Sequence, residues 1–192
     1  MIRARVSRGG RSLPTVFRGI QAIEVKAQCA TFLGLGPAPT FEQTVLLYPL
    51  VTLAHVCEEW RRFTRWAQRH GSPRYSRRQY VVTHLAGIAL ATSGALLVRA
   101  FPSGLATLAF IGLLFGPSIA CNALFHIGAN LLTRAYCPGV VTSVVLYLPV
   151  ALLVLFTVVR DGILSRSTVV AAMLGAAGFH VREVGHKVFK RW

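Results

Sequence analysis

The sequence predicts an all-α fold, an integral membrane helical bundle of about five transmembrane helices. Three observations favour it: 54% of the 192 residues are hydrophobic, only 14% are charged, and the apolar residues gather in long runs. An α-helix needs about 20 such residues to cross the hydrocarbon core of a bilayer. The chain therefore has room for these spans and short connections, but not for a separate soluble domain.

The distribution of charge supports the same class. There are 21 Lys and Arg residues against six Asp and Glu, which gives a net charge of +15. Such a charge could serve nucleic-acid binding, but the basic residues lie almost entirely between the apolar runs, where phospholipid head groups would face them. We therefore expect the lipid bilayer as the partner, and no nucleic acid.

Residues 1–40 predict a basic arm ahead of the bundle, which we assign to residues 41–192. The arm contains six basic residues and one acid, and it includes Gly9-Gly10 and the breaker-rich stretch "GLGPAPT". No apolar run long enough to span a membrane fits here. We expect the arm to be disordered or to lie on the membrane surface.

The first span is expected at 41–60 and includes charged residues. Its purely apolar part, 45–57, is too short to cross about 30 Å, so His55, Glu58 and Glu59 must lie inside the membrane or at its edge.

A strongly basic loop, "RRFTRWAQRHGSPRYSRR", follows the first span. Short connections with Pro, Gly or Asp separate the later spans, as expected of turns. These spans are expected at 79–99, 104–132, 139–159 and 167–187. Short basic loops tend to lie on the cytoplasmic side of a membrane. We therefore expect a multi-pass cell-membrane protein whose first loop and carboxyl terminus lie in the cytoplasm.

Five alternating spans bring most of the ionisable groups to one membrane surface. The end of span one, the start of span two and the ends of spans three and five all face the same side. Five of the six histidines and three of the six acids lie there. The polar residues concerned are His55, Glu58, Glu59, Tyr80, His84, Asn122, His126, His180, Glu183 and His186.

This convergence predicts a metal site. A charged group at mid-membrane costs at least about 2.5–3.5 kcal/mol, so each needs a partner or a function. Imidazole and carboxylate bind iron, zinc and manganese, and helical bundles build one-metal or dinuclear sites from them. We assign His55, Glu58, His126, His180 and His186 as metal ligands, with Glu59 or Glu183 as a further ligand or general base and Asn122 as an orienting residue.

Residues one apart on a helix differ by about 100° in direction, so Glu58 and Glu59 cannot both face the histidines. We expect Glu58 to do so.

Simpler interpretations exist for each residue. Glu58 is spaced to pair with Arg61 or Arg62, and Glu183 with Lys187. His84 alone is typical of a hydrogen bond between helices.

Three motifs resemble a known family. "HVCEE" at 55–59, "NALFH" at 122–126 and "YCPG" at 136–139 resemble, in order, the HXXEE, NAXXH and YXPG motifs of the HXXEE domain family of small bacterial membrane proteins. The resemblance covers about 41–187 and names no reaction. It carries over onto His55, Glu58, Glu59, Asn122, His126, Tyr136, Pro138 and Gly139.

In the third motif, Pro138 suits the first turn of span four and Gly139 allows close backbone approach. Tyr136 is either an interfacial anchor or a catalytic proton donor beside the cluster.

Together these patterns predict a metal-dependent membrane hydrolase or oxidoreductase that acts on a lipid-like or apolar small molecule. Two alternatives stay open. One is a metal-free acid/base enzyme of the isomerase or cyclase type that uses the Glu pair. The other is a transporter or proton relay, although the opposite half of every span has almost no ionisable groups.

Overall fold

A computed structural model describes residues 38–187, except for the side chains of residues 183 and 185–187. The helices described below all belong to one compact unit, which begins at Pro39. The predicted basic arm therefore lies almost wholly outside the described residues.

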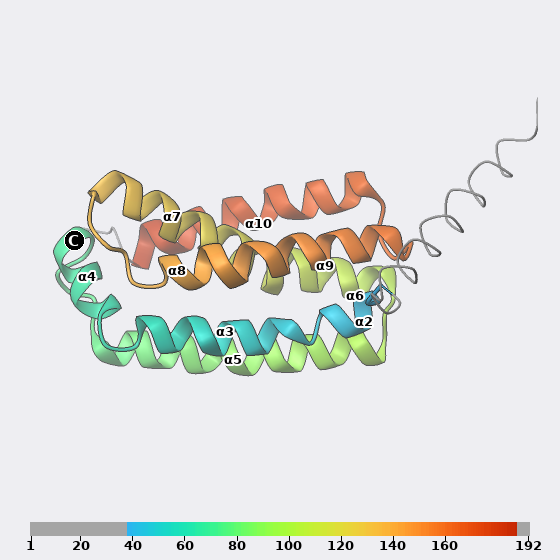
Figure 1. Cartoon of the computed structure of the whole chain (residues 1–192), viewed down its shortest axis with the longest axis horizontal. Helices are drawn as coiled ribbons and strands as arrows, with labels where there is room; N and C mark the ends of the chain where they lie inside the picture. Colours follow the sequence, from blue (N-terminus) through green and yellow to red (C-terminus); the bar gives the residue numbers. More distant parts are fainter. Residues whose placement is uncertain (1–37, 188–192) are drawn as a thin grey trace, which may run out of the picture. The chain divides into compact units, whose positions relative to one another are not determined.

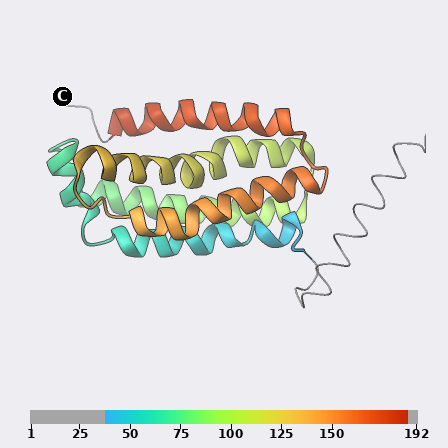
Figure 2. The same ribbon diagram turned by 45° about the horizontal axis from the view of Figure 1, so that its top comes forward.

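The described part of the chain is all-helical, as predicted. Helical rods lie side by side, joined by short connections (Figures 1 and 2). In chain order the elements are α2 (Phe41–Thr44), α3 (Leu47–Glu59), α4 (Phe63–His70), α5 (Arg77–Ala100), α6 (Gly104–Ala109), η1 (Phe110–Cys121), α7 (Asn122–Thr133), α8 (Val140–Thr142), η2 (Ser143–Tyr147), α9 (Leu148–Arg160) and α10 (Arg166–Lys187). The segments η1 and η2 are π-helical, and each continues into its neighbours to form one long rod.

The helix boundaries follow local chemistry. Ser76 begins α5 with a capping box, because its hydroxyl accepts from the Gln79 N–H while the Gln79 side chain accepts from the Ser76 N–H. Ser103 caps α6 in a similar way, by accepting from the Ala106 N–H. The predicted turns between the later spans are confirmed.

Three of the described helices are long and apolar enough to cross a membrane: Arg77–Ala100, Gly104–Thr133 and Val140–Arg160. The predicted count of five is therefore not reproduced. The first rod is interrupted at residues 45–46, which leaves α3 with 13 residues. In α10, polar and small residues such as Ser167, Gly175 and His180 dilute the apolar ones.

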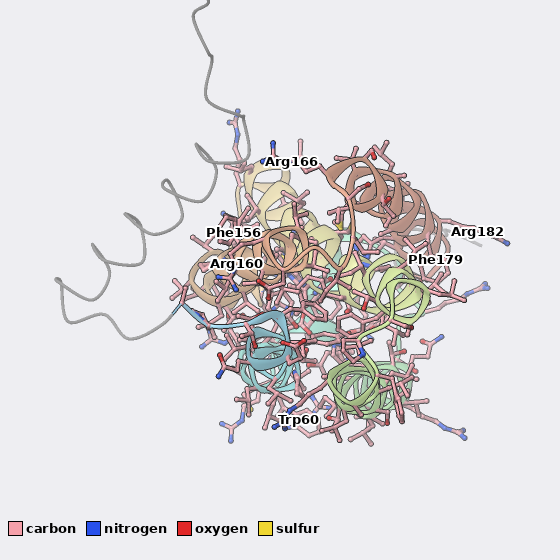
Figure 3. The ribbon with its side chains drawn as sticks, turned by 90° about the vertical axis from the view of Figure 1, so that its right-hand side faces the viewer. Trp60, Phe156, Arg160, Arg166, Phe179 and Arg182 are labelled. Atoms are coloured by element: carbon pink, nitrogen blue, oxygen red, sulfur yellow. The ribbon has the colours of Figure 1, made fainter. Side chains whose placement is uncertain are left out.

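Large apolar side chains cover the outside of the bundle. Leu85 on α5, Leu113 on η1 and Leu152 on α9 are each more than 60% exposed, whereas Phe115 and Val154 are fully buried. Figure 3 shows Phe156 and Trp60 pointing away from the rods. Leucines on an outer face are expected where lipid, not water, is the solvent.

The basic segment 61–78, expected as a loop, contains helix α4. Phe63, Trp66 and Ala67 follow helical spacing and are buried, while Arg65 and Arg69 on the other face are exposed. The buried face packs with Tyr80 and Cys137 across one end of the bundle. In Figure 1, α4 lies at the end where α3 and α7 finish and α5 and α8 begin.

Candidate metal centre

Glu59 lies at the centre of the polar cluster. It occupies the last position of α3, is 2% exposed, and its two carboxylate oxygens face histidines from three helices. Oε1 lies 3.1 Å from His126 Nε2 and 3.6 Å from His55 Nε2, and Oε2 lies 2.8 Å from His84 Nε2. Tyr80 donates a longer bond of 3.4 Å to Oε2. A buried carboxylate is thus surrounded by donors and imidazoles, as a group of this charge requires.

The bond between His84 and Glu59 contains one shared proton. The Nδ1 atom of His84 lies 2.7 Å from the carbonyl of Tyr80, and a carbonyl can only accept, so Nδ1 is protonated. The 2.8 Å contact between Nε2 and Glu59 Oε2 then needs a further proton. His84 and Glu59 therefore form an acid–base pair.

The tautomer of His55 follows from its other partner. His55 Nδ1 lies 2.7 Å from Thr142 Oγ1, which lies 2.6 Å from a carboxylate oxygen of Glu58. The carboxylate accepts the hydroxyl proton, so the hydroxyl oxygen accepts from His55 Nδ1. His55 Nε2 is left with a lone pair, which accepts from the Asn122 amide at 3.2 Å.

Two lone-pair atoms consequently face each other, His55 Nε2 and Glu59 Oε1. No proton lies between them at 3.6 Å, so a cation could bind both atoms once the Asn122 amide releases the same lone pair of His55. Together with a nitrogen of His126, the ligand atoms of these residues lie within 4.8 Å of one another, and all three side chains are buried. A tetrahedral ion with bonds of about 2.1 Å needs ligand atoms about 3.4 Å apart. This buried group can therefore hold a metal ion.

Glu58 points elsewhere, at the start of α8. Its Oε1 accepts from the backbone of Gly139 at 2.9 Å and Val141 at 3.2 Å, and its Oε2 accepts from the backbone of Thr142 at 2.7 Å. A carboxylate at a helix N-terminus satisfies unpaired N–H groups and favours the helix dipole. The expectation that Glu58 faces the histidines is wrong: Glu59 does. The structure also shows no ion pair from Glu58 to Arg61 or Arg62.

Tyr136 donates to the same carboxylate, at 2.6 Å from Glu58 Oε1. Partial burial and this hydrogen bond raise the pKa of Tyr136 to about 12, so the phenol stays a donor. The structure thus places Tyr136 on Glu58 and not on the histidines. Pro138 lies in the turn just before α8.

Gly139 packs directly against the site. Its φ of +99° is in the left-handed region, and a Cβ there would lie 2.7 Å from His55 Cε1 and 2.8 Å from His126 Cε1. The prediction of close backbone approach at Gly139 is confirmed. The third motif, through Gly139, therefore packs against the histidines of the first two motifs.

His126 is held from behind by Cys137. The thiol sulfur lies 3.4 Å from His126 Nδ1. Burial, and then the charges of Glu59 and Glu58, raise the pKa of Cys137 to about 12, so it remains a thiol. Contacts of this kind fix the orientation of a ligating histidine.

The remaining predicted residues are less closely placed. His180 lines the same pocket as the cluster, and its buried Nε2 has no hydrogen-bond partner among the described atoms. It is not part of the compact ligand group. The side chains of Glu183 and His186 lie outside the described residues, so their assignments stay predictions.

The site opens into a pocket of about 300 Å³. Apolar side chains from three rods form much of the lining, among them Leu90 on α5, Leu113 on η1 and Phe179 on α10. An ion held by Glu59 and two histidines would thus have a mostly apolar space beside it.

Sequence reasoning left Thr142, Cys137 and Tyr147 out of the site. Tyr147 stacks on His55 with ring centroids 4.3 Å apart. Cys137 lies at the variable position of the third motif, and Thr142 and Tyr147 lie in an apolar run, so no local signal marks them as site residues. His84 did carry a local signal, because it is an ionisable residue near the end of an apolar span. It was expected on the correct membrane surface, but only as a residue that forms a hydrogen bond between helices.

Over residues 38–187, the fold and the site together define an all-helical bundle with apolar helices able to cross a membrane and a buried His/Glu group. The family described as "Protein of unknown function with HXXEE motif" matches residues 46–154, more than half of the chain. The chain belongs to this family. No curated protein and no solved structure matches it.

Proposed function

We propose that this protein is a metal-dependent integral membrane enzyme that acts on a lipid-like or apolar substrate. The observation that carries the proposal is the convergence of His55, Glu59 and His126 beside an apolar pocket. Three protein ligands with an open fourth position are typical of catalytic metal sites.

A bound ion would supply an activated water for hydrolysis or, as iron, the means to use dioxygen for oxidation. These three donors are compatible with iron, zinc or manganese, and we propose a single ion. Glu59 and the two histidines would hold the ion. His84 would exchange a proton with the carboxylate, and Asn122 would orient the substrate.

We further propose that all the rods cross the bilayer. Leu50 and Leu53 on α3 and Val170 and Leu174 on α10 are each more than 50% exposed, as on the three helices of sufficient length. An apolar substrate would then reach the pocket from within the membrane, and the basic segment with α4 would lie in the cytoplasm.

Metal analysis of the detergent-purified chain tests the centre. After expression in medium supplemented with iron, zinc and manganese, we expect about one transition metal per chain. Glu59→Gln should lower the content at least tenfold, because it removes a charged ligand. Glu58→Gln should retain more metal than Glu59→Gln, because Glu58 reaches His55 only through Thr142, and it should lower stability by about 1–2 kcal/mol, because the carboxylate caps α8. A wild type without metal, or equal loss in both variants, would contradict the assignment.

The shared proton of His84 and Glu59 favours a second candidate, a metal-free acid/base enzyme. Glu58 and Glu59 bind different partners, so the base would be Glu59 alone and not a Glu pair. Metal-free protein that converts a lipid-like substrate, and loses this activity in both Glu59→Gln and His84→Gln, would favour this candidate.

A further inference from the structure

A second pocket, of about 400 Å³, lies between α4 and the turn before α8. Arg62, Arg65 and Arg69 line it, together with Trp66, His70, Ala135, Tyr136 and Pro138. It shares no lining residue with the pocket of the metal centre. We call it the α4 basic pocket.

The positive charge of the α4 basic pocket is not neutralised by the described residues. No ion pair joins Arg62, Arg65 or Arg69 to a described carboxylate. Glu58, which contacts Tyr136, already accepts from three backbone N–H groups and two hydroxyls. Arg65 makes one hydrogen bond of 3.5 Å to the carbonyl of Arg61. Three guanidinium groups thus surround one hollow without a countercharge.

The helix presents these donors on one side. Arg62, Arg65 and Arg69 are three and seven positions apart, which is close to whole turns of an α-helix. Trp66 lines the same pocket, is 6% exposed, and its buried Nε1–H has no described acceptor. The three guanidinium groups carry only donors, so the lining favours a ligand rich in acceptor oxygens.

Guanidinium groups match the oxygens of a phosphate through paired hydrogen bonds. The pocket lies at the end of the bundle where the buried face of α4 covers the rods, which is the level of lipid head groups if the rods cross the bilayer. We propose that the α4 basic pocket binds a phosphate group, presented by an anionic lipid. This site does not depend on the metal centre or on its reaction.

Binding to the full chain in a neutral detergent tests the proposal. Dihexanoyl phosphatidic acid and inorganic phosphate would each be titrated by calorimetry. The double variant Arg65→Gln/Arg69→Gln removes two charges from the pocket. The control, Arg74→Gln/Arg78→Gln, removes two charges from exposed residues outside it. All four arginines are exposed, so helical content should not change.

We expect the lipid to bind the wild type and the control within twofold of each other, and the pocket variant at least tenfold more weakly, since each basic residue near an anionic lipid contributes about fivefold. Inorganic phosphate should follow the same order with lower affinity. Equal affinity for lipid and phosphate would overturn the lipid as the source. No binding, or equal weakening in both variants, would overturn the pocket itself.

Discussion

Glu58 and Glu59 are adjacent but support different parts of the molecule. Glu59 gathers His55, His84 and His126, while Glu58 binds the backbone at the start of α8. Thr142 connects the two sets, because its hydroxyl contacts both Glu58 and His55. The cap of α8 therefore orients a ligand of the candidate metal centre.

Gly139 gives a test at the scale of one residue. Gly139→Ala should lower stability by at least about 1–2 kcal/mol, from the left-handed backbone alone. It should also disturb His55 and His126, since the new Cβ would lie within 2.8 Å of both rings. Thermal unfolding and bound metal in detergent would measure the two effects.

Two other glycines provide control variants that distinguish the effect of backbone strain from the effect of contact with the histidines. Gly162 has φ of +73° and no atom within 4 Å of a built Cβ, so Gly162→Ala should show the strain and keep the metal. Gly128 has open space in a helix, so Gly128→Ala should stabilise by about 0.5–1 kcal/mol. If Gly139→Ala behaved like Gly162→Ala in both measurements, its contact with the histidines would be unimportant.

At the scale of elements, α4 and α2 close opposite ends of the bundle. Helix α4 buries Phe63 against His126 of the candidate metal centre, with ring centroids 5.7 Å apart. At the other end, Asp161 after α9 accepts from the N–H of Phe41, the first residue of α2, at 2.8 Å. Arg160 also donates to Asp161, at 2.7 Å. One carboxylate thus joins the first rod to the fourth.

The Asp161 contact predicts a pH dependence. Burial alone would raise the pKa of Asp161, but the hydrogen bonds from Arg160 and Phe41 outweigh it and lower the pKa below its usual 3.8. The stabilisation is therefore present above that usual value and is lost as pH falls through the folded-state pKa. Asp161→Asn should cost less than about 1 kcal/mol at pH 7, because the group is partly exposed.

Thermal unfolding at pH 7, 5 and 3 would measure the difference between wild type and Asp161→Asn, which should shrink toward pH 3. Glu42→Gln is a suitable control, since Glu42 lies in the first turn of α2 and makes no described hydrogen bond through its side chain. A difference that stayed constant with pH would show that the charge of Asp161 does not join the rods.

At the scale of the whole molecule, α5 and α10 begin at opposite ends of the bundle (Figure 1). Arg74 lies in the turn just before α5, and Arg166 is the first residue of α10. If the rods cross the bilayer, single cysteines at these positions should face opposite sides. In a background with the four native cysteines replaced by alanine, a membrane-impermeant maleimide should label Arg166→Cys on intact cells. It should label Arg74→Cys only after permeabilisation. Labelling of both from one side would contradict the crossing.

The sequence by itself determined the all-helical class, the positions of the long helices and the end of the bundle at which the polar groups gather. It could do so because apolar length and turn residues are local properties. The predicted spans 79–99, 104–132 and 139–159 agree to within a few residues with α5, with α6, η1 and α7, and with α8, η2 and α9. It overestimated the number of long apolar helices because residues 45–46 interrupt the span predicted at 41–60 and because polar and small residues dilute the apolar ones in α10.

Tertiary structure decided which carboxylate enters the site. Glu58 and Glu59 are adjacent residues of the same type, and their side chains differ by about 100° in direction. The elements on each side of α3 determine which of the two contacts the histidines. Because α8 begins next to Glu58, the unpaired N–H groups at the start of α8 donate to the Glu58 carboxylate. The Glu59 carboxylate is therefore the one that contacts His55, His84 and His126. The position of a helix start, 80 residues further along the chain, thus determines the ligands of the candidate metal centre.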